Sequence, residues 1–380
     1  MKNKLRDLVC TLILLVEAGT GNAQTMVPKK CYMHLAGTIN KEYLAEMNLV
    51  KINDTLYGDY FFTQAGKLPA GMKDKDKVIP VSGRMTSTDA FLLKETGTGT
   101  GSSFSGKFLN GQSLSGTFLN ASGSQQMPFD FSERYPEGSV PMNAYYEKAS
   151  MPLVRKPKGP AANIQLGILL PSESANPLIF DSIRELLLMK FSGKPLRISD
   201  PVRVMDGIKQ VYFDNYLASN EGIYTEEMSA TFNWQSMIFM HVLMNSAHLL
   251  TLYTDHYAFT GGAHGLQTRQ YTVFSLWSGK EVVFKYLFGE NNTSALSEII
   301  TRKIRGMKGI GDMQSLKDAG FFTDEIQPSD NFYVTRDGIG FYYNQYDIAS
   351  YAMGPVDVFI PFAELNKVLV NTAVLRDIMK

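Results

Sequence analysis

The chain has 380 residues, of which 44% are hydrophobic and 19% are charged, so it can bury the cores of two or three globular domains. Lysine plus arginine and aspartate plus glutamate number 37 each, and this balance excludes a global field that would attract nucleic acid or an anionic membrane surface. The 23 phenylalanines and 19 tyrosines favour β structure.

Residues 1–23 have the pattern of a secretion signal peptide. Three basic residues precede an apolar stretch over 8–16, and Gly21 and Ala23 place small residues before a cleavage site. Neither cysteine follows the residue triplet of a lipoprotein signal, and no later apolar run has the length of a membrane span. We therefore expect a leader of the signal-peptidase I type and a periplasmic or secreted protein without a membrane span.

Residues 31–135 alternate short runs of β-forming residues with turn residues and show no helical periodicity. The clearest hairpin joins the similar units Phe104-Ser-Gly-Lys-Phe108 and Leu114-Ser-Gly-Thr-Phe118 through Asn110-Gly111, and their central glycines suit close backbone approach. Eight strands are expected, which predicts an all-β meander closed into a barrel, with an open sandwich as the alternative. Such a barrel either fills itself with side chains, the interpretation we favour, or holds one ligand.

An α+β domain is expected after a proline-rich linker over 136–162. The segment 163–250 is predicted to be a small α+β subdomain with helices over 177–191 and 201–218, the second capped by Asp200. The segment 251–380 continues with hairpins and with helices that include a short one over 313–319. Helices followed by antiparallel hairpins indicate helices packed on one face of an antiparallel sheet.

A glycine-rich turn lies between two expected strands at 257–265, which reads Tyr-Ala-Phe-Thr-Gly-Gly-Ala-His-Gly. Gly261 and Gly262 can adopt positive φ and reverse the chain sharply. The segment is therefore either a structural hairpin or the edge of a site.

The same region concentrates titratable residues and gives the candidate binding residues Asp255, His256, Tyr257 and His264. Strand alternation places Asp255 and His256 on opposite faces, and no third ligand follows at helical His-x₃-His spacing, so we predict no metal site. No Gly-x-Ser-x-Gly motif of a hydrolase occurs, and no cofactor is expected. We expect His264 to hydrogen-bond the backbone of the turn.

A series of motifs in the second half of the chain resembles one family of exported domains. In chain order they are Thr260-Gly-Gly-Ala-His-Gly265, Ser278-Gly-Lys-Glu281, Asn331-Phe-Tyr-Val-Thr335, Gly338-Ile-Gly-Phe-Tyr-Tyr343, the segment 346–355 and Ile360-Pro-Phe-Ala-Glu-Leu365. They resemble the C-terminal domain shared by the RsiV anti-sigma factor and the PdaC peptidoglycan deacetylase, with the usual preceding small domain from residue 163. The N-terminal third of the chain lies outside this resemblance.

The resemblance implies an exported recognition module. In the anti-sigma factor the domain is an extracytoplasmic receptor for lysozyme, and in the deacetylase catalysis belongs to a separate module. Motif residues expected to be structural are Gly261, Gly262, Gly265, Tyr351, Gly354 and Pro355. We predict a non-catalytic recognition protein of the bacterial envelope that binds a protein, such as a lysozyme-like one, or a glycan. The alternative is an envelope hydrolase or metal-dependent enzyme that uses Asp255, His256 and His264.

Overall fold

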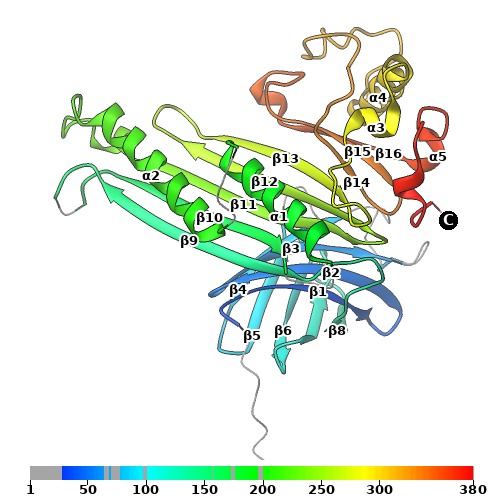
Figure 1. Ribbon diagram of the computed structural model, residues 1–380, viewed down its shortest axis with the longest axis horizontal. Coiled ribbons are helices and arrows are strands. Elements are labelled where there is room, and N and C mark those ends of the chain that lie inside the picture. Colours follow the sequence, from blue (N-terminus) through cyan, green and yellow to red (C-terminus); the bar gives the residue numbers. More distant parts are fainter. Residues whose placement is uncertain are drawn as a thin grey trace, which may run out of the picture.

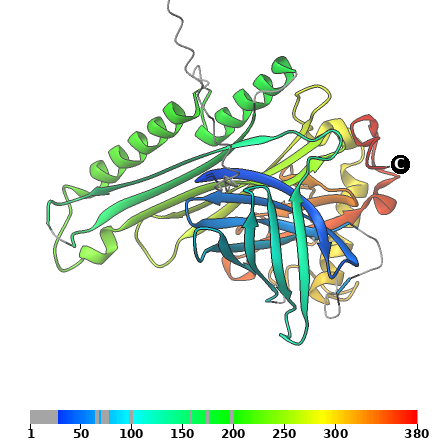
Figure 2. The same cartoon turned by 90° about the horizontal axis from the view of Figure 1, so that it is seen from below.

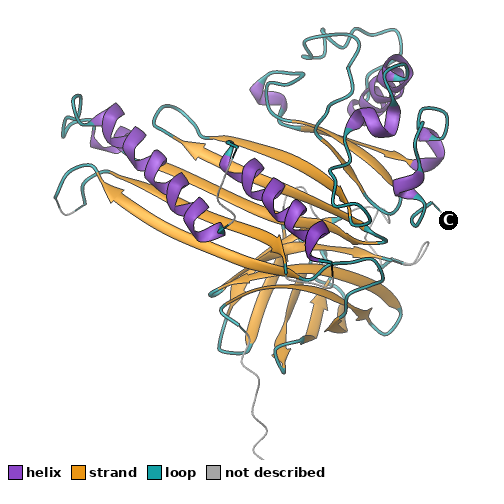
Figure 3. Ribbon diagram, in the orientation of Figure 1, coloured by secondary structure: helices purple, strands orange, loops and turns teal. Residues whose placement is uncertain are grey.

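The structure is a computed structural model that describes residues 28–63, 68–69, 78–96, 101–156, 158–172, 176–195 and 200–379. The expected leader, residues 1–23, lies outside the described residues. The chain forms a closed barrel, a five-stranded sheet with two long helices on one face, and a C-terminal part built on a three-stranded sheet (Figures 1 and 3). The barrel and the two helices lie on opposite sides of the five-stranded sheet (Figure 1).

The barrel has the eight expected strands, and it is closed because residues 35–39 of the first strand pair with 129–133 of the last. The strands are β1 (Lys30–Ile39), β2 (Tyr43–Ile52), β3 (Thr55–Phe62), β4 (Ile79–Met85), β5 (Ala90–Glu95), β6 (Ser103–Leu109), β7 (Ser113–Leu119) and β8 (Gln126–Glu133). The closure confirms the barrel and excludes the open sandwich.

The barrel interior is filled by its own aromatic side chains. Phe104 is fully buried, and its ring centroid lies 5.0 Å from that of Tyr60, 4.8 Å from Phe118 and 5.4 Å from Phe129. Inward-facing residues of a small barrel occupy its interior in this way. The favoured interpretation, a barrel filled with side chains, is therefore the one that the packing supports.

The two repeated five-residue units pair through their glycines. Gly106 and Gly116 are register partners, and a Cβ added to Gly116 would lie 2.1 Å from the carbonyl oxygen of Ser105 and 2.5 Å from the Cα of Gly106. Only glycine allows this approach of two backbones. The close contact expected from the sequence is confirmed.

The five-stranded sheet has the order β13-β12-β11-β10-β9. Its strands are β9 (Met142–Pro152), β10 (Ala161–Pro171), β11 (Trp234–Ser246), β12 (Leu249–Phe259) and β13 (Leu266–Ser275). The pair β10–β11 is parallel and the other pairs are antiparallel, because α1 (Pro177–Ser192) and α2 (Pro201–Asn220) form the crossover between them. Both helices cover one face (Figure 3). The Asp200 side chain accepts hydrogen bonds from the first-turn amides of α2, as expected.

Two expected boundaries are wrong. The supposed linker over 136–162 contains β9, which pairs with β10 along its whole length. Proline is compatible with this strand because β9 is an edge strand, Pro141 precedes it and Pro152 is its last residue. The boundary at 250/251 falls inside β12, since β11 and β12 form one long hairpin of the same sheet. Residues 163–250 are therefore not a separate subdomain.

The C-terminal part packs short helices on the sheet of order β14-β15-β16. Its elements are α3 (Phe284–Phe288), α4 (Thr293–Lys308), β14 (Phe332–Val334), β15 (Gly338–Tyr343), β16 (Val356–Pro361) and α5 (Phe362–Leu365), with 3₁₀ turns η2 (Tyr351–Met353) and η3 (Ala373–Leu375). Its core also takes in Met244, Leu249 and Val273 at the end of the five-stranded sheet. The expected helix over 313–319 is absent, and the segment forms turns, since so short a run gains few helical bonds for its nucleation cost. Within the described ranges, no helix combines the length and the apolar character needed to cross a bilayer.

Candidate functional site

Polar side chains that interrupt apolar strands connect the barrel to the five-stranded sheet. Asn48 of β2 is buried, accepts a hydrogen bond from the Tyr32 hydroxyl at 2.8 Å and donates to the carbonyl of Leu243 at 3.4 Å. Asn245 of β11 is also buried, donates to the carbonyl of Val140 at 2.7 Å and accepts from its amide at 2.9 Å. Each buried amide is satisfied by groups from another part of the fold, which fixes how the parts meet.

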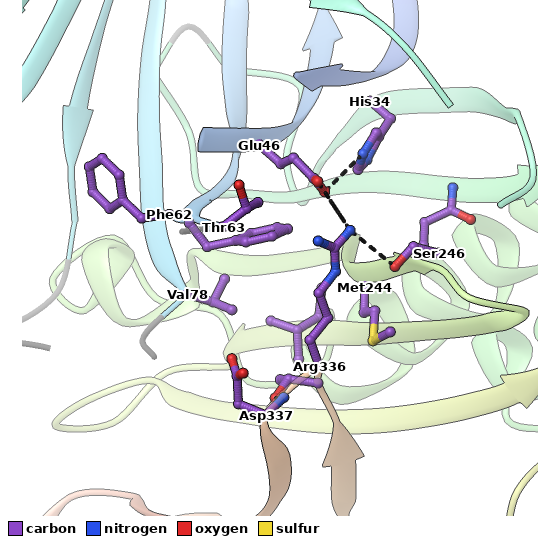
Figure 4. A pocket seen from close by; sticks show the side chains of 13 residues that line it. His34, Glu46, Phe62, Thr63, Val78, Met244, Ser246, Arg336 and Asp337 are labelled. Atoms are coloured by element: carbon purple, nitrogen blue, oxygen red, sulfur yellow. Dashed lines mark hydrogen bonds and ion pairs between the residues drawn. The ribbon is translucent and has the colours of Figure 1, made fainter. Parts of the chain in front are cut away.

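One arginine joins all three parts. Nη2 of Arg336, in the turn between β14 and β15, donates to both carboxylate oxygens of Glu46 in β2 at 3.1 and 2.9 Å and lies 3.4 Å from Oγ of Ser246 at the end of β11 (Figure 4). His34 of β1 approaches the same carboxylate, with Nε2 3.3 Å from Oε2. Burial opposes the charged form of Glu46, but hydrogen bonding from His34 and the charge of Arg336 outweigh it, so the pKa of Glu46 is lowered.

Two adjoining cavities surround this arginine. The inner one has a volume of about 100 Å³ and an apolar wall made by Phe61, Phe62, Val78, Leu243 and Met244, with Glu46, Thr335 and Arg336 beside it (Figure 4). The outer one has a volume of about 740 Å³ and also borders Ser246 and Arg336. We call the two together the junction cleft.

An aromatic and charged cluster forms the outer wall of the junction cleft. The Trp277 indole is 49% exposed, and the His248 ring stacks on it with centroids 3.8 Å apart. The guanidinium of Arg376 lies 4.4 Å from the indole centroid, and Nδ1 of His248 lies 3.1 Å from Asp377. His248 has a positive φ of 59°, in the tight turn between β11 and β12 that turns its ring toward Trp277.

The sequence-predicted candidates are distributed over three places. Asp255 forms a two-pronged ion pair with Arg269, with N–O distances of 2.7 and 2.8 Å. His256 lies on the other face of the same strand, 3.3 Å from Oγ of Ser236, as the strand alternation predicts. Burial lowers the pKa of His256. His264 is exposed in the β12–β13 turn, so the three titratable side chains do not converge.

The glycine-rich turn is held against the C-terminal part. Nδ1 of His264 lies 3.2 Å from the carbonyl oxygen of Gly265, so the ring contacts a carbonyl of the turn rather than its amides. Its ring stacks on Tyr351 with centroids 4.2 Å apart, and the Tyr351 hydroxyl donates to the same carbonyl at 3.3 Å. A Cβ on Gly265 would lie 2.5 Å from the Tyr257 ring, so the glycine allows that ring to pack flat on the turn.

The remaining motif residues occupy backbone positions. Gly261, Gly262 and Gly354 have φ of 91°, 94° and 70°, a region that glycine adopts without steric cost. Pro355 follows Gly354 and directly precedes β16.

The charged groups of the junction cleft are held in place by one another. Over the part of the chain that the structure describes, no three histidine, cysteine, aspartate or glutamate side chains are grouped to hold a metal ion. Sequence patterns did not single out Glu46, Arg336 and Trp277 as site residues. The signals that could have indicated them are a carboxylate and an arginine beside apolar strands and one of only two tryptophans in the chain.

Residues 285–363 match a family model described as "Protein of unknown function (DUF3298)". A crystal structure of a DUF3298 family member from Bacteroides fragilis NCTC 9343 is similar at 25% identity and a TM-score of 0.60, over 64% of this chain and 98% of that one. Another, from Pseudomonas aeruginosa PAO1, is similar at 19% identity and a TM-score of 0.44, over 60% and 94%. No curated protein matches the chain. The match begins in α3 and ends in α5, so it includes Arg336 and leaves out the 257–265 turn.

Proposed function

We propose that this chain is an exported, non-catalytic recognition protein of the bacterial envelope that binds a protein or glycan partner in the junction cleft. The observation that carries the proposal is the cleft itself, which lies where the barrel, the five-stranded sheet and the C-terminal part meet. Ligand sites occur preferentially at such interfaces, where different parts of a fold supply convergent polar groups.

The lining of the cleft supports recognition of a polar partner. Trp277 and Arg376 are half exposed, and tryptophan and arginine are the residue types that contribute most to binding interfaces. Only Nη2 of Arg336 takes part in the hydrogen bonds to Glu46 and Ser246, so its other guanidinium donors can serve a partner. Pairing of His248 with Asp377 holds the aromatic wall in position.

The export and the class of partner rest on the sequence. The signal-like residues 1–23 support secretion, and the resemblance to the RsiV and PdaC C-terminal domain supports an extracytoplasmic receptor. The hydrolase alternative depends on Asp255, His256 and His264 acting together. Because these side chains lie on two faces of β12 and in an exposed turn, they lack the mutual geometry of a catalytic group.

The proposal is tested by direct binding of the full-length chain. Biolayer interferometry with immobilised c-type lysozyme and co-sedimentation with insoluble peptidoglycan supply one protein and one glycan probe. We expect retention by at least one probe. Retention by neither contradicts the proposed function.

A matched pair of variants assigns the binding to the junction cleft. Trp277→Ala combined with Arg376→Ala removes two exposed groups of the cleft wall, and Tyr286→Ala removes a 43% exposed aromatic of α3 outside the cleft lining. The cleft variant should bind at least about tenfold more weakly, the loss expected for interface hot spots, while the control binds like the wild type. Equal binding by both variants contradicts the placement in the cleft.

A further inference from the structure

A further pocket, separate from the two cavities of the junction cleft, lies on the face of the five-stranded sheet opposite α1 and α2. The barrel covers only part of this face, and strands β11 to β13 extend beyond it (Figure 2). Tyr57 of β3 and side chains of β11, β12 and β13 line the pocket, which has a volume of about 290 Å³. None of its lining residues belongs to the junction cleft.

The strand register builds the floor of this pocket from two rows of side chains. Phe239, Asp255 and Arg269 are register partners across β11, β12 and β13. Met237, Tyr257 and Gln267 form the next row, two residues along each strand. Residues two apart on a strand share a face, so two aromatic rings, a thioether and an amide lie side by side.

The charged groups beside the pocket neutralise each other. Nε and Nη2 of Arg269 donate to the two oxygens of Asp255 at 2.7 and 2.8 Å, and the guanidinium lies 4.1 Å from the centroid of the Tyr253 ring. A bidentate pair of this kind satisfies the carboxylate internally. The pocket therefore has no net charge to attract an ionic ligand.

Two polar atoms at the inner wall of the pocket lack partners. The Tyr57 hydroxyl and Nδ1 of His241 are buried, and neither has a hydrogen bond to any group of the described chain. The Tyr57 ring lies 4.9 Å from that of His241 and 5.6 Å from that of Phe239. Both atoms are closed to solvent, so Tyr57 and His241 contribute apolar ring surface to the pocket wall rather than hydrogen-bonding groups.

We propose that this pocket binds a neutral sugar ring of a glycan. A pyranose has apolar C–H faces that pack on aromatic rings such as those of Phe239 and Tyr257, and hydroxyl groups that both donate and accept hydrogen bonds. The Gln267 amide is exposed at the pocket and can both donate to and accept from those hydroxyls. The pocket volume of about 290 Å³ is close to the lower limit for ligand pockets, which is about 300 Å³. It therefore suits one sugar ring, and the rest of the glycan would lie along the part of the sheet that the barrel leaves uncovered. The pocket adds a sugar subsite to the recognition function proposed above.

Isothermal titration calorimetry of the full-length chain with three trisaccharides tests this subsite. Triacetylchitotriose and cellotriose are neutral and differ in N-acetylation, and trigalacturonic acid is the anionic control. At least one neutral trisaccharide should bind, and the anionic one should not. Tyr257→Ala should weaken binding at least tenfold and Gln267→Ala several-fold. The controls Tyr286→Ala and Gln270→Ala, the latter exposed on the other face of β13, should bind like the wild type.

Several outcomes overturn the sugar subsite. The subsite is refuted if the protein binds neither neutral trisaccharide or binds only the anionic one. It is also refuted if Tyr257→Ala and Gln267→Ala both bind with the affinity of the wild type. Gln267 is exposed, so its variant should fold even if Tyr257→Ala does not, and equal thermal midpoints verify this. Trp277→Ala should leave trisaccharide binding unchanged. If the protein binds a neutral trisaccharide but is retained by neither lysozyme nor peptidoglycan, the proposed site in the junction cleft is refuted and the sugar subsite stands. If the protein is retained by one of those probes but binds no trisaccharide, only the sugar subsite is refuted.

Discussion

Replacing Asp59 by asparagine should remove a pH dependence of folding stability. Asp59 of β3 is 3% exposed and accepts hydrogen bonds from the Tyr253 hydroxyl at 3.0 and 3.2 Å, across the boundary between barrel and sheet. Burial raises its pKa from 3.8 to about 7, although the charge of Arg269 and the bond from Tyr253 oppose the shift. Asparagine keeps an oxygen that can accept from Tyr253 and carries no charge.

The direction in which the folding stability changes with pH follows from proton binding. Because the folded state binds the Asp59 proton more tightly than the unfolded state, the stabilisation is fully present below pH 3.8 and is lost as pH rises to about 7. Between pH 5.5 and 8.5 this loss amounts to about 2 kcal/mol, from one and a half pKa units at about 1.36 kcal/mol each. The free energy of unfolding of Asp59→Asn should therefore rise by about that amount relative to wild type over this interval.

Urea denaturation at pH 5.5, 7.0 and 8.5, followed by tryptophan fluorescence, measures the difference. The lowered pKa of His241, about 4 because of its burial, affects both proteins and cancels in the comparison. Beyond pH 7 the difference between the two proteins should level off. Parallel stability profiles over the whole range would show that the Asp59 pKa is ordinary and that the burial argument is wrong.

Two further predictions concern the barrel and the junction. Gly116→Ala should destabilise the protein by about 2–3 kcal/mol, because the added Cβ would meet backbone atoms of β6. Gly207→Ala in α2 should stabilise it by about 0.5–1 kcal/mol, because nothing lies within 4 Å of the added Cβ and alanine favours the helix. Thermal midpoints measure both, and a tolerated Gly116→Ala would contradict the close approach. A double-mutant cycle of Glu46→Gln and Arg336→Gln in urea denaturation should give a coupling energy of about 0.5–3 kcal/mol. Strictly additive effects would show that the Glu46–Arg336 ion pair does not hold the barrel to the C-terminal part.

The barrel could be predicted from the sequence because its signals are local. Alternation within short strands, the Asn110-Gly111 turn and the central glycines of the paired units each act within a few residues. Strand β9 was not predicted because prolines lie at both of its ends, which is typical of a linker. The structure shows that β9 is an edge strand that pairs only with β10, and such a strand tolerates these prolines. The parallel pairing of β10 with β11 was not predicted either, because it depends on the crossover that α1 and α2 form between these strands.

The two proposed binding sites could not be predicted because they depend on contacts between distant parts of the chain. Glu46, Ser246 and Arg336 lie in three different parts of the fold and meet through packing of whole sheets. Asp255 and Tyr257 were identified as candidates, but their partners Tyr57 and Phe239 were not. Strand alternation was sufficient to predict that Asp255 and His256 lie on opposite faces of their strand.

Hydrogen–deuterium exchange of the full-length chain tests recognition in the junction cleft most directly. It would be measured with and without the probe that retains the protein, c-type lysozyme or solubilised peptidoglycan. The account predicts slower exchange in three separate segments that line the cleft, around Ala247, Trp277 and Arg336. Slower exchange confined to the 257–265 turn, with no change around these three residues, would contradict it.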